Sequence, residues 1–167
     1  MRHFPAALAL SLAVALTASI GQSAERQPDP RAVMLEKQGE AKLASGDVQG
    51  AIDDFEAALA IDPGYTAIYL DLGEAARRQG LHGKAIHFYR QALEREPNNF
   101  AAISGEGAAL VEKGALEKAK RNLSKLETMC GSNCRETKSL SSVIARGPQQ
   151  PVLTAEAVTP DPVVTQN

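Results

Sequence analysis

"AIDDFEAALAIDP", residues 51–63, is followed at a step of 34 residues by "AIHFYRQALEREP", residues 85–97. Both stretches begin with Ala-Ile, carry an aromatic residue in the middle, continue with Ala-Leu and close on a proline. The same step relates further positions along the chain, namely Gly39, Gly73 and Gly107, then Gly46, Gly80 and Gly114, and then Ala51, Ala85 and Ala119. Self-similarity at a fixed period of this length is typical of a helical repeat array.

Apolar residues inside each period recur at the three- and four-residue spacing of a helix. The first stretch of each period places on one face Leu35, Gly39 and Leu43, then Tyr69, Leu72, Gly73 and Ala76, and then Ile103, Gly107, Leu110 and Val111. A glycine inside a helix costs about 1 kcal/mol relative to alanine, so we expect a neighbouring helix to cross closely at these glycines. Pro63 and Pro97 end the second stretch of two periods, because proline cannot continue a helix. The pattern predicts two helices per period.

This combination of period, glycines, aromatic residue, Ala-Leu and closing proline resembles the tetratricopeptide repeat over about residues 32–130. The resemblance implies an all-α fold, a right-handed α-solenoid of three helix-turn-helix repeats at about 32–65, 66–99 and 100–133. The third repeat diverges, since Leu123 replaces the aromatic residue and Gly131 replaces the proline.

A further helix is expected after the third repeat, at residues 134–146. Asn133 and Glu136 have the spacing of an N-terminal capping box, and Leu140, Val143 and Ile144 lie at helical spacing. We expect this C-terminal capping helix to cover the exposed side of the last repeat, which completes a repeat domain of residues 32–146.

The two ends of the chain read differently from the repeats. Arg2, the apolar run of residues 6–20 and the small residues after it predict a cleaved signal peptide at residues 1–24, with the cut site open by a few residues. The run is shorter than the roughly 20 residues of a membrane span, so we expect membrane contact only if this segment stays uncleaved. Residues 25–31 read as a linker and residues 147–167 as a disordered, Pro-rich tail. We therefore expect secretion across the inner membrane and a periplasmic location.

Cys130 and Cys134 are the only cysteines in the chain. In an exported protein a close pair favours a disulfide, which would fix the angle of the capping helix. The alternative is an accessory role in thiol-disulfide chemistry, although the spacing differs from the two-residue gap of thioredoxin-type sites. Two cysteines alone do not complete a zinc site.

Neither the charge nor the motifs of the chain favour a nucleic-acid-binding protein or an enzyme. The formal net charge is −2, with no basic excess. The sequence holds no Ser-His-Asp arrangement, phosphate loop or dinucleotide fingerprint, so we expect no catalytic residues and no cofactor. His82 and His87 read as solvated residues rather than metal ligands.

In the tetratricopeptide family the first helices line a concave groove that takes a peptide or helix from a partner protein. Carried over to this chain, the resemblance places on the groove Glu36, Glu40, Leu70, Asp71, Glu74, Arg77, Arg78, Ser104 and Val111. Members that clamp the acidic C-terminus of chaperones place Lys and Asn on this surface, whereas the matching positions here hold Glu36, Glu40, Asp71, Ala101 and Gly105. That clamp is absent.

The groove is expected to be acidic in its first half and small or apolar toward the third repeat, which would suit a partner with a basic end and an apolar end. In the alternative interpretation the acids form a solvated face, with Arg77 and Arg78 neutralising Glu74 and Asp71. The sequence thus predicts a non-enzymatic protein-interaction module of the cell envelope, an adaptor, scaffold or assembly factor. A self-associating structural protein is the second hypothesis, and the thiol accessory is the third.

Overall fold

A computed structural model describes residues 26–148. The predicted signal peptide and all but the first two residues of the predicted tail lie outside this range. Residues 26–148 form seven helices and no strand. These are α1 (Pro30–Ser45), α2 (Val48–Ile61), α3 (Thr66–Arg78), α4 (His82–Arg95), α5 (Phe100–Glu112), α6 (Leu116–Cys130) and α7 (Arg135–Arg146).

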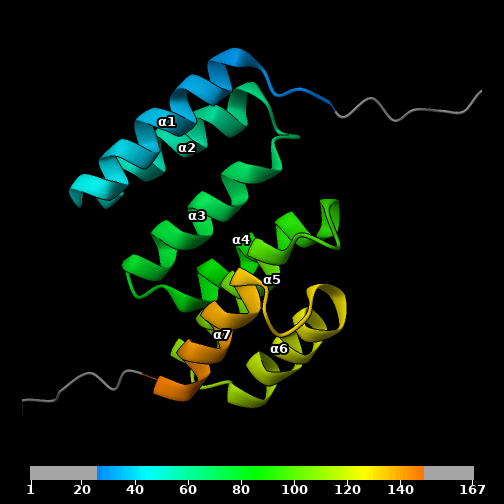
Figure 1. Ribbon diagram of the computed structural model, residues 1–167. Coiled ribbons are helices and arrows are strands. Elements are labelled where there is room, and N and C mark those ends of the chain that lie inside the picture. Colours follow the sequence, from blue (N-terminus) through cyan, green and yellow to red (C-terminus); the bar gives the residue numbers. More distant parts are fainter. Residues whose placement is uncertain (1–25, 149–167) are drawn as a thin grey trace, which may run out of the picture.

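The helices pack in consecutive pairs that stack along the chain. Helix α1 packs on α2, α3 on α4 and α5 on α6, while α2 also contacts α3 and α4 contacts α5. Figure 1 shows the α1–α2 pair at one end and the α5–α6 pair, with α7 beside it, at the other. The predicted all-α solenoid is confirmed, and the helix pairs follow the 34-residue step of the sequence.

The repeated glycines allow the two helices of a pair to cross closely. A Cβ atom on Gly39 would lie 2.5 Å from Cε1 of Phe55, and one on Gly73 would lie 2.7 Å from Cζ of Tyr89. Gly46 ends α1 with a φ of 90°, which only glycine adopts at little cost. The predicted close crossing is therefore confirmed at Gly39 and Gly73.

Helix α7 takes part in the core of the third pair. A Cβ atom on Gly107 of α5 would lie 2.6 Å from Cδ2 of Leu140, which belongs to α7 and not to α6. Leu140 is fully buried in a cluster with Ile103 and Leu126, and Ile144 packs against the same cluster. The predicted apolar face of the capping helix is confirmed, and it closes this end of the array.

The predicted capping box at the start of α7 is wrong. The helix begins at Arg135 with Cys134 as its N-cap residue, and no side chain caps it. Gly131 turns the chain with a φ of 85°, and its carbonyl oxygen accepts a hydrogen bond from the hydroxyl of Thr137 at 3.0 Å. Because this turn sets the helix start at Arg135, Glu136 lies too early in the helix to form the box with Asn133. Among the seven helices described, none is long and apolar enough to span a bilayer.

Candidate functional site

Three carboxyl groups of α1 and α3 lie close together on the surface predicted to be the groove. Glu36 and Glu40 of α1 and Asp71 of α3 form this acidic cluster, and the hydroxyl of Tyr65 donates a hydrogen bond to Oε2 of Glu36 at 2.5 Å. Burial and the charges of Glu36 and Glu40 raise the pKa of Asp71 to about 7. The cluster therefore carries less negative charge at neutral pH than three ordinary carboxylates would.

Asp71 is the member of the cluster with a buried oxygen that has no hydrogen-bond partner among the described residues. Its Oδ2 atom is buried and accepts no hydrogen bond from any described residue. A buried polar atom without a partner is unfavourable, because it has lost its contact with water and gained nothing in exchange. A donor supplied from outside the chain would remove this cost.

The arginines of α3 are paired with carboxylates other than Asp71. Arg77 contacts Oε2 of Glu74 at 2.8 Å and Oε1 of Glu112 at 2.5 Å. Arg78 contacts Oε1 of Glu74 at 3.2 Å and donates to the carbonyl oxygen of Leu43 at 2.6 Å. Local neutralisation by arginine therefore applies to Glu74 and leaves the acidic cluster uncompensated.

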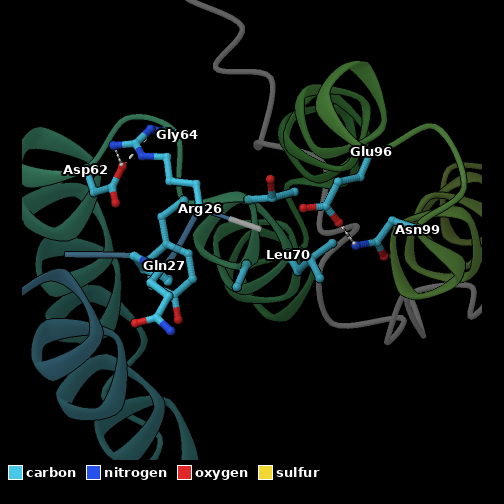
Figure 2. Close-up of a pocket in the computed structure, with 11 residues that line it drawn as sticks. Arg26, Gln27, Asp62, Gly64, Leu70, Glu96 and Asn99 are labelled. Atoms are coloured by element: carbon cyan, nitrogen blue, oxygen red, sulfur yellow. Dashed lines mark hydrogen bonds and ion pairs between the residues drawn. The ribbon is translucent and has the colours of Figure 1, made fainter. Parts of the chain in front are cut away.

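A cavity of about 520 Å³ opens beside the acidic cluster. Its walls come from the segment before α1, the α2–α3 turn, the start of α3 and the α4–α5 turn, with Leu70 between the two sides (Figure 2). Tyr65 lines the cavity and also bonds to Glu36, so the cavity and the cluster form one continuous surface. An apolar side chain that entered this cavity would meet Leu70 and Ala67 of α3.

The wall formed by the chain's own N-terminal segment is held by Asp62, which is only 2% exposed. Its carboxylate accepts hydrogen bonds from Arg26 at 2.8 Å, from the backbone N–H of Asp29 at 3.0 Å and from that of Gly64 at 3.1 Å. On the opposite wall the amide of Asn99 donates to Glu96 at 2.8 Å (Figure 2). These contacts fix the cavity on both sides.

Two third-repeat residues that were predicted for the groove, Ser104 and Val111, are buried rather than open. Ser104 is 9% exposed and donates a hydrogen bond to the carbonyl oxygen of Glu136 in α7 at 3.2 Å. Val111 is 1% exposed and belongs to a cluster against which Val143 of α7 packs. Neither residue presents a surface to a partner, because α7 lies against α5. The accessible site is confined to α1, α3 and the adjoining turns.

No motif of the sequence marks Tyr65, Asp62 or Glu96 as a site residue. Asp62 and Glu96 precede the two closing prolines at the step of 34 residues, so the repeat alignment offers a signal for them. Their different burial, with Asp62 enclosed and Glu96 exposed, depends on the segment before α1 and has no counterpart in the pattern.

The other polar residues singled out in the sequence lie away from this surface. Cys130 and Cys134 are joined at the junction of α6 and α7, with their Cα atoms 5.9 Å apart, and Sγ of Cys134 lies 2.9 Å from the hydroxyl of Thr137. The oxidation of this pair in solution stays a prediction. His82 lies 3.2 Å from Glu112, and residues 26–148 contain no group of three His, Cys, Asp or Glu that could hold a metal ion.

The chain is similar to proteins of one repeat family. The family model described as tetratricopeptide repeat matches residues 36–100 and, overlapping them, 70–119. No curated protein matches the chain.

Solved structures of this family share the fold. The Sgt2 TPR domain from Aspergillus fumigatus is 24% identical, with a TM-score of 0.64 over 74% of this chain and 87% of that one. The second TPR domain of human RPAP3, solved with the HSP70 peptide SGPTIEEVD, is 18% identical, with a TM-score of 0.61 over 68% and 94% of the two chains. The Yersinia enterocolitica type III secretion chaperone SycD, solved with a peptide of the translocator YopD, is 23% identical, with a TM-score of 0.60 over 68% and 86%.

Proposed function

The chain belongs to the tetratricopeptide repeat family, and we propose that it is a non-enzymatic adaptor. The adaptor would hold a segment of a partner protein on the surface formed by the acidic cluster and the adjoining cavity. The unpartnered Oδ2 atom of Asp71 carries the proposal. It is a buried acceptor that Glu36 and Glu40 surround with negative charge, and the arginines of α3 are engaged elsewhere. A positively charged side chain of a partner would supply both the donor and the opposite charge.

The neighbouring cavity indicates which kind of partner side chain would lie beside the positively charged one. Leu70 and Ala67 offer an apolar contact, and Tyr65 joins the cavity to Glu36. The partner segment would therefore place an aliphatic side chain in the cavity close to a Lys or Arg at the cluster. This corrects the expected placement of the apolar end, since α7 buries the third-repeat surface.

The proposed partner differs in charge from the peptide bound to one relative. The HSP70 peptide in the human RPAP3 complex, SGPTIEEVD, carries three acidic residues and no basic one. Such a peptide would bring further negative charge to Glu36, Glu40 and Asp71, which is unfavourable. The predicted signal peptide supports a location in the cell envelope, where the adaptor would serve as a scaffold or assembly factor.

A selection from a random dodecapeptide library displayed on phage would test this function. The parent chain would be compared with Glu36→Gln, Glu40→Gln, Asp71→Asn and with a control, Asp53→Asn, Glu56→Gln, whose acids are exposed on α2. We expect the parent and the control to enrich peptides that pair Lys or Arg with an aliphatic residue, and the cluster variant to lose this preference. Enrichment of acidic peptides, or no difference between the two variants, would contradict the proposal.

Capture from an envelope extract would then identify the natural partner. The same three chains would be used, each shown by circular dichroism to be folded. A protein retained by the parent and by the α2 control, but lost from the cluster variant, would be expected to carry the selected motif.

A further inference from the structure

The step of 34 residues identifies three equivalent helix faces, of which two are covered and one is not. In α3 the face holds Ile68, Leu72 and Ala75, which are at most 1% exposed and lie in one cluster with residues of α2. In α5 the equivalent residues are Ala102, Glu106 and Ala109, which are at most 8% exposed.

The cover on α5 comes from the preceding helix as well. Ala109 belongs to a cluster with Ile86 and Tyr89 of α4, and Glu106 pairs with Arg90 of α4 at 2.8 Å. In both α3 and α5, the first helix of the pair thus packs this face against the preceding helix.

Helix α1 carries the equivalent face with no described helix over it. The three positions hold Met34, Gln38 and Ala41, all exposed, and Met34 is 54% exposed. A shallow depression of about 440 Å³ lies there, lined also by Pro30, Val33 and Lys37. The face is the open end of the array, opposite to the end that α7 closes (Figure 1).

The chain before α1 does not carry the pattern of a covering helix. The helices α2 and α4 cover their neighbours with Phe55 and Tyr89 at the central position. At the same step, the chain before α1 has Gly21 at that position and Thr17 where Ala51 and Ala85 stand. A glycine and a threonine do not supply the large apolar side chain that the other two faces receive.

The face is instead complementary to itself. In an antiparallel pair of α1 helices with a twofold axis between Lys37 and Gln38, Met34 of one copy lies opposite Ala41 of the other, and the reverse contact follows from symmetry. A long, flexible side chain then meets a small one twice, and the two Gln38 amides meet near the axis, where they can bond to each other. The two Lys37 amines extend past the contact into water.

We propose that two copies of this chain associate through this α1 face, as a symmetric antiparallel helix pair that covers Met34. One helix face is smaller than the roughly 800 Å² per partner of a standard stable interface, so the dimer is weak and depends on concentration. The contact leaves the acidic cluster unaltered, so this inference and the proposed groove function stand or fall separately.

Sedimentation equilibrium of the full chain, from micromolar to millimolar concentrations, would measure the association. We expect a monomer–dimer equilibrium that Met34→Lys weakens by about tenfold or more, since the largest apolar side chain of the contact is lost from both copies. The matched control is Leu81→Lys, because Leu81 is the other large exposed apolar residue among residues 26–148, at 48%. A parent that stays monomeric, or equal effects of the two substitutions, would overturn the proposal.

Cross-linking would test the geometry itself. A thiol at the twofold axis, in Gln38→Cys, should give covalent dimers with a short bismaleimide, whereas Gln49→Cys, exposed on α2, should not. No covalent dimer from Gln38→Cys would overturn the symmetric dimer. Slow reaction of the same variant with a monofunctional maleimide would show in addition that the face is covered within one chain.

Discussion

In the first and third helix pairs, different helices supply the side chain that packs against the equivalent glycines Gly39 and Gly107. In the first pair Phe55 of α2 lies against Gly39 of α1, so the pair is packed by its own two helices. In the third pair Leu123 stands at the position of Phe55 and is only partly buried, while Leu140 of α7 lies against Gly107. Helix α7 is therefore part of the core of the third pair and not an appendage to it.

The largest effect we expect is from truncating the two equivalent residues, Phe55→Ala and Leu123→Ala. Phe55 is fully buried, so its loss should lower the free energy of unfolding by about 3–5 kcal/mol. Leu123 is partly exposed, and its loss should cost about 1 kcal/mol. Urea denaturation followed by circular dichroism measures both. Equal losses would mean that the third pair is packed like the first.

Leu140→Ala in α7 should lower the free energy of unfolding about as much as Phe55→Ala does in the first pair. Leu140 is fully buried with Ile103 and Leu126, and truncating such a leucine lowers the free energy of unfolding by about 2–5 kcal/mol. Its neighbour Ser141 is exposed, so Ser141→Ala provides the control and should change little. If Leu140→Ala affected only a local, non-cooperative step, then α7 would be an independent addition.

The sequence predicted those parts of the fold that depend on local pattern. The helix pairs and the close crossings at Gly39 and Gly73 follow from spacing that residues share with their equivalents in the other repeats, and the apolar face of α7 follows from helical spacing alone. The partner of Gly107 could not be read in this way, because Leu140 approaches it from outside the repeat.

The candidate site was predictable only in part for the same reason. The resemblance to the repeat family indicated Glu36, Glu40, Leu70 and Asp71, and the structure places Leu70 on a cavity beside the acidic cluster. Repeat position did not indicate that α7 buries Ser104, nor that the segment before α1 forms a wall, because these contacts involve chain segments that have no equivalent in the other repeats.

A smaller effect should separate the equivalent acids Asp62 and Glu96. Asp62 is 2% exposed and accepts hydrogen bonds from two backbone N–H groups and from Arg26, so Asp62→Ala leaves donors unpaired and should cost about 1–3 kcal/mol. Glu96 is exposed, and Glu96→Ala should change the free energy of unfolding by less than about 0.5 kcal/mol. Thermal denaturation at matched pH compares them. A Glu96 variant as unstable as the Asp62 variant would show that the two turns are equally constrained.

The last comparison concerns an acid that only the second pair holds at its position, since the equivalent residue of the first pair is Lys37. Asp71 faces Glu36 and Glu40, whereas its equivalent in the third pair is Gly105. Burial and those two charges raise the pKa of Asp71 from 3.8 to about 7, so the folded chain holds a proton there that the unfolded chain has released. This contribution to stability is complete below about pH 4 and is lost as the pH rises through about 7.

Asp71→Asn should therefore flatten the pH dependence of unfolding. The asparagine keeps the shape of the protonated acid and cannot ionise, so between pH 5 and pH 8 the variant should gain about 2–3 kcal/mol of stability relative to the parent. Asp53→Asn, exposed on α2, is the control and should leave the pH profile parallel to that of the parent.

A peptide that brings a Lys or Arg to the cluster should lower the pKa of Asp71 and so release its proton. Binding of the peptide can be measured by calorimetry at pH 7 in two buffers of different ionisation enthalpy. We expect proton release from the parent and none from Asp71→Asn. The same proton release from both chains would separate Asp71 from the binding surface.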